Sequence, residues 1–311
     1  MTRLDLRCDP LRLEVDPALG GAVTGLWLCP DGARPTPLLR PTPGFASHFD
    51  NTACYLLAPW VNRLPGGVLD WRGERHVLRA NWPDPSAIHG DVHSRPWRIL
   101  DRSPVSAHLG IEARDASARN WPWAYGARVR YELGPDFLEC ALEVRNLDTR
   151  PMPAGLGFHP YFQRALWHAS ECPRVTLACT GRYPLRACIP TGPARDDELC
   201  RALRAGALID DLVARADGLD DVFAGFDGKA EILWPASGVR ASFACSDAFG
   251  HAVIYAPRHS AGPSTFFTLE PVSTTTNAAA LEAAGVPGTG LRTLAPGEAL
   301  RATWRLTIAR V

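Results

Sequence analysis

The sequence contains one lysine, Lys229, and no stretch that is rich in Lys and Arg. The 33 basic residues balance the 33 acidic ones. Nucleic acids and anionic membranes select basic patches, so neither is an expected partner. No apolar run approaches the roughly 18 residues that cross a membrane, and the N-terminal segment lacks an apolar core of signal-peptide length. We therefore expect a cytoplasmic protein.

Several common site motifs are also missing. Nine cysteines lie between Cys8 and Cys245, but none forms a C-x-x-C pair, which favours a reduced chain whose thiols act as small core side chains. G-x-G-x-x-G and Walker loops do not occur, so no nucleotide cofactor is indicated. G-x-S-x-G is absent as well, which argues against a nucleophilic serine.

The dominant pattern is alternation of apolar and polar residues. In the segment 125–133, for example, Val129 and Tyr131 share one face, while Arg128 and Arg130 share the other. This period of two is typical of half-buried strands in antiparallel sheets. It predicts strands over 11–15, 108–113, 125–133, 137–147, 239–245 and 300–311.

Turn signals separate these strands at short intervals, and a helical pattern is found only over 196–216. There Leu199 and Leu203, and then Leu208 and Leu212, are four residues apart. We find no linker or repeat. The sequence therefore predicts an all-β protein, in which residues 1–311 form one large antiparallel β-sandwich domain with few short helices.

Several polar residues that could carry chemistry stand in apolar or rigid settings. Asn62, His89 and His159 lie close to Pro or Gly, which fix the backbone and so aim the neighbouring side chains. Each one alone has a simpler interpretation as a turn residue, a surface cation, a cap or a hydrogen-bonded loop histidine. The candidates are Asn62, Arg63, His89, His159, Asp220, Asp221 and Glu270.

Glu270 is the candidate that is hardest to dismiss. It follows the apolar run F-F-T-L and precedes Pro271, which suggests a strand end that presents the acid at a rim. Desolvation there would raise the pKa of the carboxyl, which suits a base that works near neutral pH.

His89, Asp91 and His93 lie close together in the sequence and are candidate metal ligands. A tight zinc site generally needs three protein ligands with further support, and no H-E-x-x-H motif is present. The sequence therefore predicts no bound metal.

Six short motifs follow one another in a characteristic order, and together they make the chain resemble the aldose 1-epimerase (galactose mutarotase) family. The resemblance extends from about residue 20 to residue 306. The motifs are N-R (62–63), H-G (89–90), G-F-H-P-Y-F (157–162), G-x-D-x-x-F (218–223), L-E-P (269–271) and L-x-P-G-E (294–298).

The resemblance implies a galactose mutarotase-like β-sandwich, and it implies interconversion of the α and β anomers of a free sugar without a cofactor. In that family Glu270 would be the general base at the anomeric hydroxyl, and His159 would be the general acid at the ring oxygen. His89 would help to polarise the ring oxygen.

The same resemblance assigns the binding residues. Arg63 and Asp220 would bind sugar hydroxyls, and Asn62 would position Arg63. From the residues themselves, Tyr161 would help to form the floor beneath a sugar. In the segment N-W-P-W (120–123), Trp121 or Trp123 would stack on the sugar, or else both are core residues.

The chain departs from the better-known galactose mutarotases after Glu270, where it reads P-V-S-T-T-T-N-A, and it looks closer to a shorter bacterial subgroup. The natural sugar is therefore open. No obvious arginine cluster indicates a phosphosugar, but the many arginines leave room for one that folding assembles. His93 and His259 have no assigned role.

Two other functions stay open. A sugar-binding or sensing protein on the same fold would bind without turnover, because a fold alone does not determine activity. A glycoside hydrolase or lyase would need two carboxylates, which Asp220 and Glu270 could supply. In each case the partner is a small sugar, and we expect a monomer or a homodimer.

Overall fold

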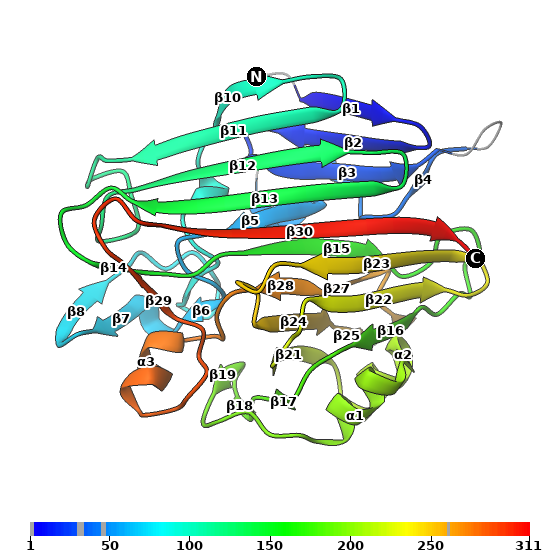
Figure 1. The fold of residues 1–311 in the computed structure, drawn as a ribbon. Coiled ribbons are helices and arrows are strands. Elements are labelled where there is room, and N and C mark those ends of the chain that lie inside the picture. Colours follow the sequence, from blue (N-terminus) through cyan, green and yellow to red (C-terminus); the bar gives the residue numbers. More distant parts are fainter. Residues whose placement is uncertain (1–2, 30–33, 45–47, 260–261) are drawn as a thin grey trace.

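The computed structural model describes residues 3–29, 34–44, 48–259 and 262–311. Two large antiparallel sheets pack face to face, one in front of the other in Figure 1. This architecture confirms the predicted all-β sandwich.

The first sheet has 11 strands and contains both candidate catalytic residues, His159 and Glu270. Its main path runs in the order β1 (Leu4–Cys8), β2 (Leu11–Asp16), β3 (Ala22–Leu28), β5 (Cys54–Leu57), β15 (Gly157–Gln163), β28 (Glu270–Val272), β24 (His251–Ala256), β21 (Leu219–Ala224) and β17 (Gly181–Arg182). Two further strands join it beside this path: β4 (Thr36–Pro37) pairs with β3, and β27 (Phe266–Thr268) pairs with β15.

The second sheet has nine strands and includes the longest strands of the fold. Its order is β10 (Arg98–Arg102), β11 (Ser106–Ala113), β12 (Tyr125–Leu133), β13 (Phe137–Asn146), β30 (Ala299–Arg310), β23 (Val239–Cys245), β22 (Lys229–Trp234), β16 (Arg174–Leu177) and β20 (Ala207–Leu208). All six strands predicted from alternation are present, as β2, β11, β12, β13, β23 and β30.

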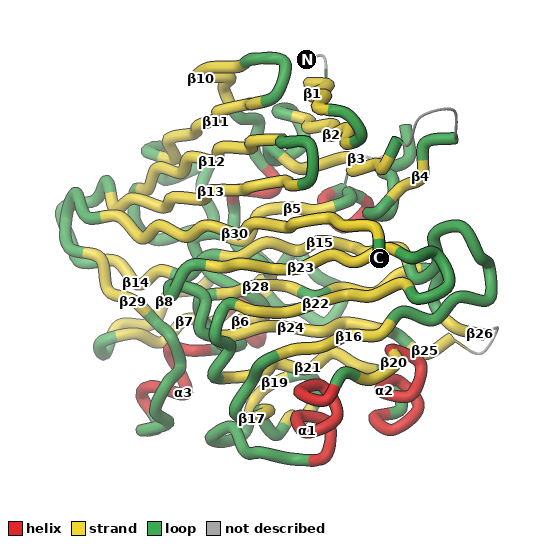
Figure 2. Tube along the Cα trace, turned by 45° about the vertical axis from the view of Figure 1, so that its right-hand side comes forward, coloured by secondary structure: helices red, strands yellow, loops and turns green. Residues whose placement is uncertain are grey.

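Small two-stranded pairs and short helices lie around the sheets, as Figure 2 shows. The pairs are β6 (Arg63–Leu64) with β9 (Ala87–Ile88), β7 (Val68–Trp71) with β8 (Glu74–Val77), β14 (Met152–Ala154) with β29 (Arg292–Leu294), β18 (Leu185–Arg186) with β19 (Ile189–Pro190), and β25 (Arg258–His259) with β26 (Gly262–Pro263). The 3₁₀ turns are η1 (Phe49–Asn51), η2 (Pro65–Gly67) and η3 (Val92–Ser94).

Three α-helices occur in the described ranges: α1 (Glu198–Ala205), α2 (Ile209–Ala216) and α3 (Ala278–Ala283). The predicted helical segment 196–216 is split into α1 and α2, because Gly206 adopts a φ of 79° and ends α1. Helix α3 was not predicted, although its run of alanines after Asn277 favours a helix. No helix in the described part of the chain is long and apolar enough to cross a membrane.

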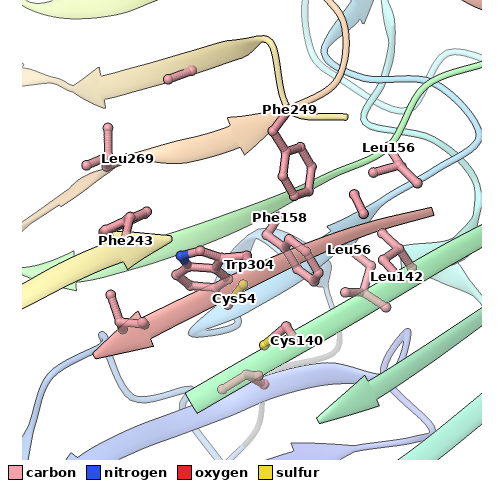
Figure 3. Close-up of a cluster of buried hydrophobic side chains, with 14 of the residues drawn as sticks. Cys54, Leu56, Cys140, Leu142, Leu156, Phe158, Phe243, Phe249, Leu269 and Trp304 are labelled. Carbon is pink, nitrogen blue, oxygen red and sulfur yellow. The ribbon is translucent and has the colours of Figure 1, made fainter. Parts of the chain in front are cut away.

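The main core fills the space between the two sheets. Figure 3 shows Leu56 and Phe158 of the first sheet facing Leu142 and Trp304 of the second. The continuous buried cluster to which they belong extends from Leu4 to Ile308. The assignment of residues 1–311 to one domain stays a prediction. A single domain requires a continuous core, and this cluster agrees with that requirement.

A second, smaller cluster covers the outer face of the first sheet. Strand alternation sends Phe158 and Phe162 into the main core, so His159 and Tyr161 point to the opposite face. Phe49 of η1, Ile88 of β9 and Leu281 of α3 are also members of this outer cluster. The first sheet is consequently buried on both of its faces, and the candidate site lies on the outer one.

Candidate active site

The central contact of the site joins His159 of β15 to Glu270 of β28. The imidazole Nε2 lies 3.1 Å from the carboxylate Oε1. Residues 159 and 270 are 5% and 1% exposed. Strands β15 and β28 are neighbours in the first sheet, so the sheet itself brings together two residues that are far apart in the sequence.

The two carboxylate oxygens of Glu270 have different surroundings. Oε1 accepts a hydrogen bond of 2.8 Å from the Thr268 hydroxyl and also contacts His159. Oε2 is buried and has no hydrogen-bond partner among the described residues. A buried polar atom without a partner is costly, and it marks a place where a bound hydroxyl would be stabilised.

Burial controls the protonation of this pair. Desolvation raises the pKa of Glu270 well above its ordinary value, and the Thr268 hydroxyl only partly offsets this effect. Desolvation, together with the smaller effect of the nearby cations Arg40 and Arg63, lowers the pKa of His159 to about 3. Both shifts favour the uncharged pair, in which the carboxyl carries a proton that it shares with the imidazole across 3.1 Å.

His89 completes a group of three polar residues. Its ring lies edge-on to that of His159, with centroids 5.0 Å apart and an interplanar angle of 86°. Desolvation lowers the pKa of His89, and the neighbouring His159 has the same effect. Its Nδ1 is buried without a hydrogen-bond partner in the described structure.

An unusual backbone holds His89 in place. His89, Gly90 and Asn62 have φ values of 63°, 90° and 55°. The His89 amide donates to the Asn62 carbonyl at 3.0 Å, which ties the two segments together. Strained backbone of this kind costs about 1–3 kcal/mol per residue and collects at functional sites.

Arg63 is held at the edge of the site by acceptors on three sides. Its Nη1 donates to Asp220 at 3.1 Å, and its Nε donates to Asp84 at 3.0 Å. The Asn62 side-chain oxygen accepts from the Arg63 amide at 2.7 Å and from Nη1 at 3.4 Å. Arg63 and Asp220 are half-buried, so this pair faces partly toward solvent.

Aromatic rings surround the imidazole of His159. Tyr55, its direct partner on β5, stacks on it with centroids 4.4 Å apart and an angle of 18°. Tyr161 lies 4.7 Å from it on the same strand. Phe266 meets Tyr161 edge-on at 5.2 Å. These rings restrict the orientation of the imidazole and form an apolar wall beside it.

The structure thus brings together seven of the residues singled out from the sequence, namely Asn62, Arg63, His89, His159, Tyr161, Asp220 and Glu270. Glu270 does not lie at a rim, as its position after F-F-T-L suggested. It starts a strand that is paired with β24 at Val253, and its side chain is enclosed.

Trp123 lies apart from this group. Its indole is 1% exposed and packs against Trp71, Trp121 and His76 in the main core. Of the two alternatives for Trp121 and Trp123, the structure therefore favours core residues over a sugar platform.

Three residues of the site were missed in the sequence. Thr268 stands two positions before Glu270, so strand alternation could have placed both on one face. Tyr55 and Arg40 gave no local signal, because their proximity to His159 comes from strand pairing and the tertiary fold.

Asp91 and His93, the possible metal ligands near His89, contact other side chains. Asp91 accepts from the Tyr125 hydroxyl at 2.7 Å and from Arg95 Nε at 2.8 Å. The ring of His93 packs on Phe49 at 3.8 Å. No group of three potential metal ligands was found among the described residues. The side chain of His259 lies outside the described part of the structure.

A sequence model of the family described as "Aldose 1-epimerase" matches residues 13–307. A relative from Escherichia coli K12, "Uncharacterized protein YphB", is 32% identical over 166 residues, which is 52% of each chain. The matched region therefore spans about half the length of that curated relative.

Solved structures share the fold over almost the whole chain. A galactose mutarotase-like protein from Clostridium acetobutylicum has a TM-score of 0.81 at 19% identity, covering 99% of this chain and 95% of its own. Galactose 1-epimerase from Lactobacillus acidophilus has a TM-score of 0.77 at 18% identity, covering 99% and 94%.

Proposed function

This chain belongs to the aldose 1-epimerase family, and we propose that it interconverts the α and β anomers of a free aldose. The observation that carries the proposal is the direct contact between His159 and Glu270, at 3.1 Å on the enclosed face of the first sheet. Opening a cyclic hemiacetal requires one group that takes a proton and one that gives a proton, close to the same carbon. This pair meets that requirement.

The proposed reaction moves two protons and breaks one bond. The Glu270 carboxylate takes the proton from the anomeric hydroxyl, a C1=O bond forms, and the C1–O5 bond breaks. His159 donates its proton to O5 as that bond breaks. Rotation about C1–C2 presents the other face of the aldehyde, and closure reverses both transfers. The steps balance without a cofactor, and each positioned acid or base contributes on the order of 10²–10⁴-fold.

Sugar binding would also set the protonation of the pair. The unpartnered Oε2 of Glu270 is the atom that we place opposite the anomeric hydroxyl. A hydroxyl that donates to this oxygen stabilises the carboxylate, and so favours the charged pair over the uncharged one. The raised pKa of Glu270 then makes it a stronger base than an exposed carboxylate.

The remaining residues would orient the sugar. We assign His89 to polarise O5 beside His159, and the Arg63–Asp220 pair to bind ring hydroxyls. Asn62 would hold Arg63 through its contacts with the Arg63 backbone and guanidinium. Tyr161 would border the sugar with its ring.

The test is exchange between anomers, measured by saturation-transfer NMR across a panel of aldoses. We expect wild type to exceed the spontaneous rate for at least one sugar. Glu270→Gln and His159→Asn should each lower this catalysed rate by at least about 100-fold. His76→Asn is a matched control, because His76 packs on Trp123 away from the pair.

Two outcomes would contradict the proposal. If wild type binds a sugar without accelerating exchange, the chain is a sugar-binding protein. If it releases reducing sugar from an aryl glycoside, and Asp220→Asn and Glu270→Gln both prevent this, it is a hydrolase.

A further inference from the structure

Thr268 is the last residue of β27, and the reaction proposed above gives it no role. It lies two positions before Glu270, and its side chain is completely buried. Thr268 pairs with Tyr161 of β15, the strand that also carries His159. Strand pairing therefore fixes this residue beside both members of the candidate acid–base pair.

On its other side, Thr268 lies where the pairing between β24 and β28 ends. The last pair of this ladder is Val253 with Glu270, so the next rung would place Tyr255 opposite Thr268. The ladder stops before that rung, and the Tyr255 amide donates to the Thr268 hydroxyl at 3.0 Å. The side-chain oxygen thus takes the place of a backbone acceptor, and this bond holds the hydroxyl in one position.

These contacts determine where the hydroxyl hydrogen of Thr268 points. A threonine hydroxyl has one hydrogen to donate and two lone pairs that can accept. The Tyr255 amide can only donate, so it occupies a lone pair and leaves the hydrogen for Oε1 of Glu270 at 2.8 Å. Since a backbone amide stays a donor at every pH, the orientation is retained in both protonation states of Glu270.

The two oxygens of Glu270 consequently have different tasks. Oε1 contacts the Thr268 hydroxyl and the imidazole of His159, whereas Oε2 has no hydrogen-bond partner among the described residues. Two contacts on one oxygen also keep the carboxyl group from turning over, so Oε2 stays directed away from them. A neutral donor on Oε1 stabilises the carboxylate relative to the carboxyl.

The charged groups around Glu270 do not replace this donor. Burial raises the pKa of Glu270, the Thr268 hydroxyl lowers it, and the charges of Asp220 and Arg63 have smaller, opposite effects. Within the described ranges, only Thr268 and His159 make polar contacts with the carboxyl oxygens. Other titratable groups that face the pair from the neighbouring elements are Cys54, Tyr55, His89 and Tyr161.

We propose that Thr268 is a positioning residue of the epimerase reaction: its hydroxyl holds Oε1, keeps Oε2 free for the anomeric hydroxyl, and favours the charged form of the pair. This inference rests on the proposed epimerase function and deepens the account of the same site. In the resting protein the pair shares one proton, and the reactive arrangement is the minor one with that proton on His159. A donor that stabilises the Glu270 carboxylate enlarges this fraction.

The substitution Thr268→Val removes the hydroxyl and keeps the shape of the side chain. We expect kcat/KM for anomer exchange to fall by about 10–100-fold, the range for a lost hydrogen bond to a charged group, because fewer molecules hold the reactive arrangement. The alkaline limb of the pH profile should move to higher pH by about one unit or more, because the carboxyl releases the shared proton less readily. Saturation-transfer NMR as a function of pH measures both effects.

Three further variants control this measurement. Thr268→Ser keeps the hydroxyl, so it should restore most of the rate and the alkaline limb of wild type. Thr24→Val is the matched control, because Thr24 is also buried in the first sheet but its hydroxyl has no hydrogen-bond partner among the described residues. It should change kcat/KM by less than about 3-fold. Thr268→Cys, with its weaker donor, replaces Thr268→Val if that variant does not fold, and should cause smaller changes of the same sign.

A direct titration of Glu270 separates the failure of the two proposals. Carboxyl signals are followed by ¹³C NMR in protein labelled at glutamate, and Glu270→Gln identifies the signal of residue 270. If no sugar is accelerated, the epimerase function fails. A raised pKa of Glu270 in Thr268→Val then still supports its control by Thr268, and an unmoved pKa refutes it. If sugars are accelerated but Thr268→Val leaves the alkaline limb unchanged, or Thr268→Ser is as slow as Thr268→Val, the epimerase function stands and the positioning role is refuted.

Discussion

The two sheets are built from similar strands but use their outer faces differently. In the second sheet, β12 alternates buried residues such as Val129 with exposed ones such as Arg128 and Arg130. In the first sheet, six of the seven residues of β15 are buried. The outer face of the second sheet is open to solvent, whereas that of the first lies beneath a second apolar cluster that contains the candidate site.

The two outer faces differ in how much their polar groups lower the stability of the fold. Outward arginines and glutamates of the second sheet pair in solvent, as Arg305 does with Glu139, and cost little. On the outer face of the first sheet, Glu270 and His159 are buried together with His89 from the loop after β9, and each of the three has an atom without a hydrogen-bond partner in the described structure. Such groups lower stability, so their presence on one face indicates a function.

The largest expected effect concerns the backbone beside His89. In Gly90→Ala, the added Cβ would lie 2.0 Å from the Ala58 carbonyl oxygen at a φ of +90°. We expect a loss of about 2–4 kcal/mol in the free energy of unfolding, because the clash involves backbone that cannot move away. Urea denaturation measures this loss.

Gly73→Ala, in the hairpin between β7 and β8, is its control. Gly73 also has a positive φ, of +80°, but a Cβ there meets nothing within 4 Å. We expect a cost of about 1–2 kcal/mol from the left-handed backbone alone. Equal losses at both glycines would show that the backbone near His89 is no more constrained than an open hairpin.

The next effect is the pH dependence of stability that Glu270 causes. Its pKa in the folded chain lies well above the value of about 4.3 for an unfolded glutamate. Between these values the folded chain holds a proton that the unfolded chain has lost. The free energy of unfolding therefore falls as pH rises, by up to about 1.4 kcal/mol per pH unit.

Glu270→Gln should remove this decline above about pH 7.5, where unfolded histidines, with a pKa of about 6.5, are mostly neutral. The buried His159 has the opposite sign, because its pKa of about 3 makes stability rise with pH on the acid side of that limit. Urea denaturation at several pH values between about 7.5 and 9 compares the slopes. An unchanged slope in the variant would mean that Glu270 is charged in the resting protein.

The smallest effect separates the ion pairs of the two sheets. Arg63 and Asp220 have side chains that are 12% and 25% exposed, against 40% and 37% for Arg305 and Glu139. Double-mutant cycles with Gln and Asn substitutions should give a coupling energy of about 1 kcal/mol or more for the site pair. The outer pair should give about 0.2–1 kcal/mol, and the reverse order would contradict the comparison.

The second sheet was the part of the fold that the sequence predicted best. Segments such as 125–133 and 300–311 alternate because one of their faces is wet, and β12 and β30 follow that pattern closely. Strands of the first sheet that are buried on both faces lose this alternation. For that reason β5, β24 and β28 were not predicted as strands, although Glu270 was singled out.

The site was predicted in its residues but not in its contacts. His159 and Glu270 stand out because each lies beside a proline in an apolar stretch. Tyr55 stacks on His159 through strand pairing, and Arg40 packs on the neighbouring Tyr161 through the tertiary fold, and no local pattern records either contact. The enclosure of Glu270 likewise depends on covering segments, such as η1 and α3, that lie far away in the chain.

The direct contact between His159 and Glu270 also determines how the protein could recover after an interrupted cycle. Should an open-chain aldehyde leave before it closes, the carboxyl holds the proton that it took from the anomeric hydroxyl, and the imidazole lacks the proton that it gave to O5. The carboxyl proton can pass directly to the imidazole across 3.1 Å, without a solvent relay, and this transfer restores the charged pair that the next sugar requires. Regeneration would then be internal, and its speed independent of buffer concentration.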